Sequence, residues 1–105
     1  MRKAIVKIHN MRCGLLYETD QEYVFEYDEE YLKDPNSVSI SMRLPISQKT
    51  YKSNVLFPFF DGLIPEGWIL DIYVSKWKLD ITDRFGLLLK LTEDPIGAVS
   101  VEEVK

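Results

Sequence analysis

The stretch LFPFFDGLIPEGW, residues 56–68, decides where the chain changes from strands to helices. It holds three phenylalanines among two prolines and two glycines, so apolar side chains are concentrated where regular structure is interrupted. Pro58 suits the first turn of a short helix over residues 57–62, and Pro65 suits the start of a longer helix over residues 66–78. The stretch therefore predicts either the core of a small domain or, in part, a surface meant for another protein.

The residues before this stretch alternate between apolar and polar side chains. Residues 3–9, 15–19 and 23–27 show the period of two that is typical of strands, and residues 10–14 and 19–21 supply turns. This pattern predicts a three-stranded antiparallel meander. In the first turn, Cys13 is expected to be a small turn hydrophobe, and His9 a surface strand residue.

The next segment predicts a short helical turn, a strand and a loop. Residues 28–37 read as one helical turn ended by Pro35, and residues 37–47 alternate again as a further strand. In this strand Val38, Ile40 and Met42 are expected to share a face. The segment QKTYKSNV, residues 48–55, reads as a polar loop.

The residues after the stretch predict a third helix and a closing strand. That helix starts near Thr82 or Asp83 and carries Phe85 and two leucines at helical spacing. Residues 93–95 should stop it, and residues 97–104 should form the closing strand. The fold class is α+β, a single domain over residues 1–105. A small antiparallel sheet, made of the N-terminal meander plus later strands, packs with two or three helices in the C-terminal half.

Composition limits the kind of protein this is. The chain has 105 residues, a formal net charge of −4, one cysteine and one histidine. A lone cysteine fits a reducing compartment, and neither a signal peptide nor a membrane span is evident, so we expect a cytoplasmic protein without a membrane partner. The acidic balance argues against direct nucleic-acid binding. Acidic residues gather between Glu18 and Glu30, which is read as a solvated hairpin rim in preference to a docking site for a basic partner.

Catalytic chemistry finds little support in the residues. There is no Gly-rich phosphate loop and no further soft ligand beside the histidine and cysteine, so neither a cofactor nor a metal is expected. Serines are plentiful, but a nucleophilic serine needs a general base, and the single histidine has no evident orienting partner. We therefore expect a protein that is not an enzyme.

The predicted helix over residues 66–78 has two different faces. At 100° per residue, Ile69, Leu70, Tyr73, Val74 and Trp77 form one broad apolar stripe. Trp68 and Ile72 fall on the opposite side, among polar residues. Trp77 is therefore expected in the core. Trp68 is either a partly exposed interface anchor or folds onto Phe59 and Phe60, and geometry alone leaves both open.

Several motifs in this chain resemble one family. FPFFDGLIPEG is similar to the FFDNLLPEG signature of the N-terminal subdomain of HipA-like serine/threonine kinases. The opening meander, the segment SISMRLPI and the ending FGLLLKLTEDPIGAVSV resemble that subdomain's other segments in the same order. The resemblance covers residues 3–101, and it ends where the kinase core of that family would begin.

The resemblance implies a free-standing subdomain like the short HipS antitoxins of HipBST toxin–antitoxin systems. In those systems HipS binds the kinase HipT and neutralises it, and HipB is the DNA-binding member. The resemblance thus implies an antitoxin that inhibits a HipT-like serine/threonine kinase by docking near its active site. Two alternatives stay open: a non-catalytic subunit that completes or activates a split kinase, and a bridge between the kinase and a HipB-like repressor.

The predicted partner-binding residues are Trp68, Gly67, Glu66, Phe59 and Asp61. Trp68 follows the PEG turn directly, where fused kinases continue with ordinary helix residues, and it would act as a rigid apolar anchor. Glu66 and Gly67 would shape the turn. Asp61 keeps the acid of the family signature, although it reads equally well as a cap or turn residue. Phe57, Phe60, Leu63 and Ile64 are expected in the core.

Overall fold

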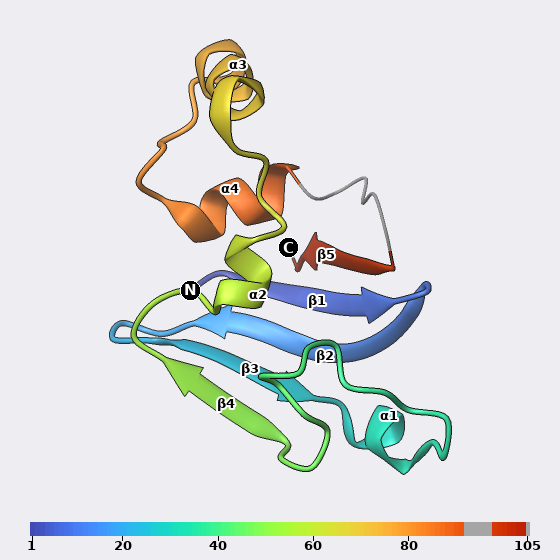
Figure 1. Ribbon diagram of the computed structural model, residues 1–105. Helices are drawn as coiled ribbons and strands as arrows, with labels where there is room; N and C mark the ends of the chain where they lie inside the picture. The colour runs from blue at the N-terminus through green and yellow to red at the C-terminus, as the bar shows by residue number, and fades with distance from the viewer. Residues whose placement is uncertain (92–97, 105) are drawn as a thin grey trace.

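The computed structural model describes residues 1–91 and 98–104. Figure 1 shows a twisted antiparallel sheet, with α2, α4 and α3 rising in turn above it. The strands and helices are β1 (Lys3–Ile8), β2 (Met11–Glu18), β3 (Tyr23–Tyr27), α1 (Glu29–Lys33), β4 (Thr50–Ser53), α2 (Pro58–Asp61), α3 (Gly67–Trp77), α4 (Arg84–Leu91) and β5 (Val99–Glu103). The sheet order is β4-β3-β2-β1-β5, and every pair is antiparallel. The predicted α+β class is confirmed, and the predicted helix stop at residues 93–95 lies outside the described residues.

The first hairpin is tighter than the sequence suggests. Its turn consists of His9 and Asn10, which both have positive φ (49° and 65°), and β2 begins at Met11. This is the conformation of a two-residue turn whose twist matches the strands, and asparagine tolerates it well. The prediction of a turn over residues 10–14 was therefore wrong. His9 lies in the turn, and Cys13 is a fully buried strand residue.

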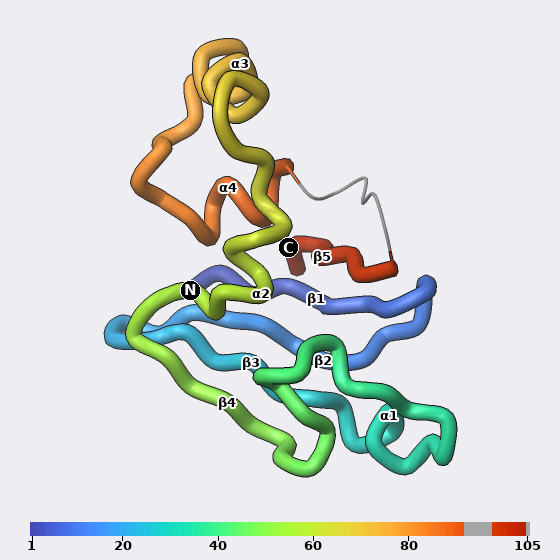
Figure 2. The backbone as a smooth tube through the Cα atoms, viewed as in Figure 1, coloured from blue at the N-terminus to red at the C-terminus, as the bar shows by residue number. Residues whose placement is uncertain are grey.

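The predicted strand over residues 37–47 does not form. Two tyrosine hydroxyls form hydrogen bonds with the backbone of this segment instead. The hydroxyl of Tyr27 donates to the carbonyl of Leu44 and accepts a hydrogen bond from the amide of Ile40. Tyr31 does the same at Val38, with O···O 2.6 Å and N···O 3.0 Å. These bonds replace ladder bonds, so the segment folds as a loop that crosses in front of β2 and β3 (Figure 2).

The loop is anchored in the core at single points. Ile40 and Leu44 are buried, whereas Val38 and Met42 are exposed, at 54% and 96%. The expected shared face of Val38, Ile40 and Met42 is therefore wrong as well, because the segment lacks the alternation of a strand.

β4 forms within the segment predicted as a polar loop. Thr50–Ser53 pairs with β3 in the register Phe25↔Tyr51 and Tyr23↔Ser53. Only Tyr51 of this strand packs against the core, while Lys52 is exposed. A short edge strand with one apolar side chain carries too weak a pattern for sequence reasoning to detect.

The core lies between the sheet and the helices α2 and α4. Phe60 of α2 packs on Phe25 of β3 with ring centroids 5.4 Å apart, and Phe85 of α4 meets Tyr23 edge-on at 5.8 Å. Phe57, Phe60 and Ile64 are buried as expected, and Leu63 packs against the core partly buried. The apolar stretch around residues 56–64 is thus the element that seals the helices to the sheet.

Candidate protein-docking site

Trp68 lies in the first turn of α3 and is exposed. Its exposed fraction is 71%, and Ile72, one turn further along, is 51% exposed. Ile69 is 42% exposed. Positions three and four apart are neighbours on a helix, so Ile72 lies beside Trp68 on one side and beside Ile69 on the other. Through Ile72 the three side chains form one patch, which we call the α3 apolar face.

α3 stands away from the sheet. Figure 1 places it at the far end of the molecule, with α4 and α2 between it and the strands. Only Leu70 is buried on this helix, and Val74 packs partly buried against the core. The molecule measures 44 × 30 × 26 Å, so it is elongated. The helix is therefore attached along a narrow seam and leaves most of its circumference exposed.

The broad apolar stripe predicted for this helix is only partly buried. Trp77 is 43% exposed, so its expected place in the core was wrong, and Ile69 of the same stripe is exposed too. Trp77 instead stacks on Tyr73 with ring centroids 5.1 Å apart, and the ammonium of Lys90 lies 5.3 Å from its ring centre. The Lys90 contact joins α3 to α4 at the surface, because a cation over an aromatic face is attracted to it even when partly solvated.

The turn before α3 depends on Gly67. Its φ is +66°, and no atom lies within 4 Å of where a Cβ would be. Backbone conformation therefore favours glycine here, whereas space does not require it. Glu66 is the N-cap residue, with an extended backbone and no side-chain capping bond. The carboxylate is exposed, so it contributes charge to the rim of the α3 apolar face.

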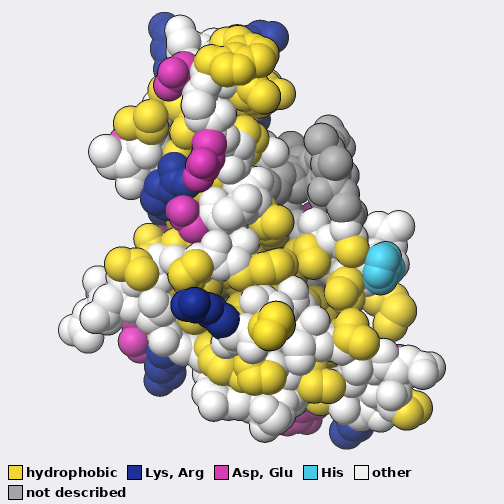
Figure 3. All heavy atoms as spheres, viewed as in Figure 1, with side chains coloured by type: hydrophobic (Ala, Val, Ile, Leu, Met, Phe, Trp, Pro, Cys, Tyr) yellow, Lys and Arg dark blue, Asp and Glu magenta, His cyan; other side chains and the backbone are white. Residues whose placement is uncertain are grey.

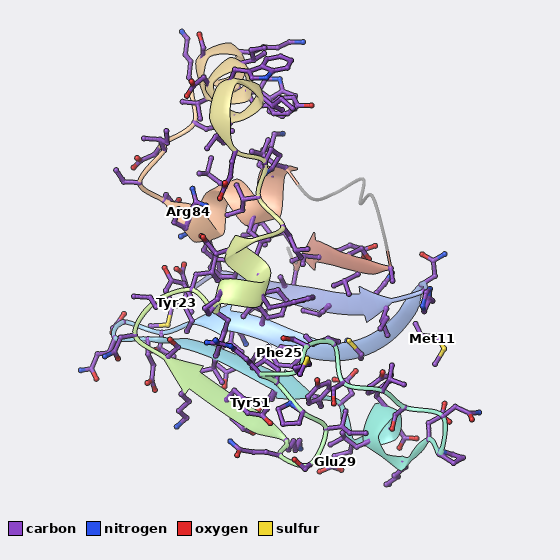
Figure 4. The ribbon with its side chains drawn as sticks, viewed as in Figure 1. Met11, Tyr23, Phe25, Glu29, Tyr51 and Arg84 are labelled. Atoms are coloured by element: carbon purple, nitrogen blue, oxygen red, sulfur yellow. The ribbon has the colours of Figure 1, made fainter. Side chains whose placement is uncertain are left out.

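Asp61 has a structural partner. Its carboxylate accepts a hydrogen bond from Arg84 Nε at 2.7 Å, which joins the end of α2 to the start of α4. Figure 4 shows Arg84 at that end of α4. This hydrogen bond is the main cause of the raised pKa of Arg84, and Glu66 adds a smaller attraction. The pair positions α4 relative to the turn that leads to Trp68.

Phe59 faces a different part of the surface. It is partly buried, meets Phe60 edge-on at 5.2 Å, and lines a cavity beside β4. No ring contact joins Trp68 to either phenylalanine within the described ranges, and Trp68 is too exposed to be folded onto them. Of the predicted site residues, Glu66, Gly67 and Trp68 thus lie together at the start of α3, while Phe59 lies elsewhere.

Sequence reasoning missed Ile69, Ile72 and Arg84 as parts of this site. The position of Ile72, four residues after Trp68, was a usable signal, because it repeats the exposed side of the helix. Ile69 could not be found this way, since its place on the apolar stripe predicted burial. Figure 3 shows hydrophobic side chains at the surface of α3, with acidic and basic side chains next to them.

Other kinds of site find no support in the described part of the chain. Residues 1–91 and 98–104 contain no group of three or more histidine, cysteine or acidic side chains that could hold a metal ion. Burial raises the pKa of the Cys13 thiol to about 12, with Asp28 adding to the shift, so the thiol is not a nucleophile at neutral pH. None of the described helices is long and apolar enough to cross a membrane.

Comparison with known proteins places the chain among relatives of one toxin. The family model described as HipA N-terminal domain matches residues 4–102. An uncharacterized protein of Haemophilus influenzae is 33% identical over 105 residues, which is 100% of this chain and 95% of that protein. A putative kinase of Sinorhizobium fredii, Y4mE, is 30% identical over 77 residues, 73% of this chain but 18% of the kinase. The solved N-terminal domain of HipA toxin has a TM-score of 0.77 and 30% identity, covering 100% of this chain and 94% of that domain.

Proposed function

Since this chain belongs to the HipA N-terminal domain family, we propose that it is a cytoplasmic, non-catalytic antitoxin subunit that binds a HipT-like serine/threonine kinase and inhibits it. The binding surface is the α3 apolar face, with Trp68 as its central anchor. In this proposal the domain supplies no catalytic group and acts through protein–protein contact.

The exposure of Trp68 carries this proposal. A tryptophan that is 71% exposed, beside Ile72 at 51%, costs free energy in water that a partner recovers by covering it. Tryptophan is enriched among residues that dominate binding energy, and truncating such an anchor costs about 2–4 kcal/mol. That corresponds to about a 30-fold loss of affinity or more.

The proposed mode of inhibition is steric. α3 stands away from the sheet (Figure 1), so a partner can cover the exposed side of this helix without meeting the strands. Gly67 and Glu66 shape the turn that presents Trp68, and the Asp61–Arg84 pair holds that turn relative to α4. Insertion near the nucleotide-binding region of the kinase would block ATP binding or hold the kinase open.

A separate subunit is favoured by the Haemophilus influenzae relative. That protein is matched over 95% of its length, so it is about as long as this chain and has no room for a kinase core. A partner kinase in trans would supply the core.

A second function is favoured by the Sinorhizobium fredii relative. In that putative kinase the matching segment is part of the same chain and covers 18% of it. A domain that forms part of a kinase chain in one protein can complete the kinase fold as a separate subunit in another. In this reading the chain activates a split kinase instead of inhibiting it.

Co-expression with a HipT-like kinase tests the proposal. Growth is scored with the native chain, with Trp68→Ala and with Lys33→Ala, an exposed lysine on α1, away from α3. We expect rescue by the native chain and by Lys33→Ala, and loss of rescue with Trp68→Ala. Toxicity that requires the native chain would instead establish the activating subunit, and rescue by all three would remove Trp68 from the site.

A further inference from the structure

A second surface feature lies beside the edge strand β4. It is a cavity of about 230 Å³. Its walls come from β4, from Arg43 and Leu44, and from residues 57–59 at the start of α2. This is smaller than the ~300–1,000 Å³ of typical small-molecule sites, so its size fits one protein side chain better than a whole cofactor.

The cavity has a mostly apolar lining. Phe57, Phe59 and Tyr51 line it, together with Pro58 and Leu44. The hydroxyl of Tyr51 is already used, because it donates to the carbonyl of Pro45 at 2.6 Å. Figure 4 shows Tyr51 on β4, beside the loop that precedes this strand. An apolar or aromatic side chain therefore matches this part of the walls, and Arg43, Lys52 and Ser53 make up the polar part.

β4 offers free backbone groups next to this cavity. It is the last strand of the sheet order, so one of its edges pairs with β3 and the other is open. The amide of Tyr27 donates to the carbonyl of Lys49 at 2.9 Å. Because bonding alternates along an antiparallel strand, Tyr51 and Ser53 also bond to β3, whereas Thr50 and Lys52 face outward.

Of the two outward residues, Lys52 is the one available for pairing. The carbonyl of Thr50 already accepts a bond from Gln48 Nε2 at 2.6 Å. Side chains alternate between faces, so the Lys52 side chain points away from the face that carries Tyr51 and the cavity. Lys52 therefore borders the cavity through its backbone, and within the described residues no bond to its outward N–H or C=O is present.

Arg43 adds an unmatched positive charge to the same place. The chain has four arginines, Arg2, Arg12, Arg43 and Arg84, and all of them are described. Three pair with carboxylates at 2.6 or 2.7 Å, but Arg43 pairs with none in the described part of the chain. No acidic residue lines the cavity that Arg43 borders. A carboxylate of another protein would therefore give Arg43 the ion-pair partner that the other three arginines have within the chain.

We propose that the open edge of β4 and this cavity bind an extended acidic segment of a partner protein. The segment adds to the sheet as a further strand and pairs with the backbone of Lys52. One of its side chains fills the cavity, and a carboxylate two residues away pairs with Arg43, because positions two apart share a face of a strand. This site is independent of the α3 apolar face and of its kinase partner.

The net charge of −4 does not prevent this. Salt screens exposed charges beyond about 8 Å under physiological conditions, so the local pairing with Arg43 outweighs the distant acids. One carboxylate beside one apolar side chain is therefore the expected recognition pattern, rather than a strongly acidic run.

A designed peptide tests the proposal on the native chain. The probe is the blocked peptide Thr-Val-Glu-Thr-Phe-Thr-Glu-Val-Thr, whose glutamates flank the phenylalanine at a spacing of two in both directions. We expect binding with amide NMR shifts centred on residues 43–44 and 50–53. Replacing both glutamates by glutamine should weaken binding about tenfold, and Arg43→Gln should weaken binding of the original peptide by the same factor. The glutamine peptide should bind the native chain and Arg43→Gln equally, because the two changes remove the same ion pair.

Backbone pairing is tested separately by N-methylation of the peptide. Methylating the threonines on both sides of the phenylalanine removes the N–H groups that would face Lys52, and should abolish binding. Methylating the phenylalanine itself is the matched control, since its N–H points away from β4, and should leave affinity within about twofold.

Four results would overturn the proposal. One is no binding by the folded chain at peptide concentrations up to about 1 mM. The second is binding that threonine methylation leaves unchanged, and the third is NMR shifts centred on α3 instead of β4. The fourth is a concentration-dependent dimer that Lys52→Pro abolishes while Lys52→Ala does not, which would assign the β4 edge to a second copy of this chain.

Discussion

At the scale of single residues, the apolar stretch over residues 56–68 divides into two parts. Phe60 is fully buried against Phe25, whereas Trp68, eight positions later, is 71% exposed. Both are large aromatic residues, so hydrophobicity alone does not distinguish them. What separates them is the turn at Gly67, which starts a helix that is attached on one side only.

This division predicts opposite effects on stability. Trp68→Ala should change the free energy of unfolding by less than about 0.5 kcal/mol, because an exposed side chain loses few contacts. Phe60→Ala should cost about 3–5 kcal/mol, because it leaves a cavity in the core. Urea denaturation of the two variants checks this, and a large loss with Trp68→Ala would mean that Trp68 supports the fold.

At the scale of elements, Arg2 holds the sheet and α4 together. Its guanidinium pairs with Glu18 of β2 at 2.6 Å and with Asp83, directly before α4, at 2.7 Å. It also lies 5.3 Å from the ring centre of Phe85. Hydrogen bonds from Arg2 are the main cause of the lowered pKa values of both Glu18 and Asp83.

These lowered pKa values predict acid sensitivity. A carboxylate whose pKa is lower in the folded state stabilises the fold at any pH above its ordinary pKa, which is 4.5 for Glu18 and 3.8 for Asp83. That stabilisation is lost as the pH falls through 4.5 toward the folded-state values. We expect Arg2→Gln to lower the free energy of unfolding by about 1 kcal/mol at pH 7, near the upper end for partly exposed pairs. Below pH 4.5 the variant should lose less stability than the native chain does, because its carboxylates no longer depend on Arg2.

The measurement is urea denaturation of the native chain and Arg2→Gln between pH 7 and about pH 3. Lys33→Gln is the control, because its contact with Glu30 is long, at 3.8 Å, and exposed. Parallel pH profiles for the native chain and Arg2→Gln would contradict the assignment of the acid sensitivity to this network.

The order of elements could largely be predicted from sequence. Periodicity two and the proline and glycine signals located the meander, α1, the three later helices and the closing strand. The strand predicted over residues 37–47 was wrong because the hydroxyls of Tyr27 and Tyr31 form hydrogen bonds with the backbone of this segment. Such contacts between separate segments leave no local sequence pattern. β4 was missed because it forms by pairing with β3, and the sequence alone does not show that residues 50–53 lie beside that strand.

At the scale of the whole molecule, the core and the candidate docking surface are separated. The sheet, α2 and α4 enclose most of the buried residues, while α3 projects from them and contributes to the 44 Å length of the molecule (Figure 2). The exposure of Trp68 was one of two alternatives that the helical pattern allowed. The exposure of Ile69 and Trp77 was not predicted, because a pattern gives the apolar stripe of a helix but not how much of it a neighbour covers.

Docking of the α3 apolar face on a kinase is tested by measuring kinase activity, with a purified HipT-like kinase titrated by the native chain and by Trp68→Ala. We expect stoichiometric inhibition by the native chain and a midpoint about 30-fold higher or more for Trp68→Ala. Equal inhibition by both chains, or activity that rises as the native chain is added, would contradict it.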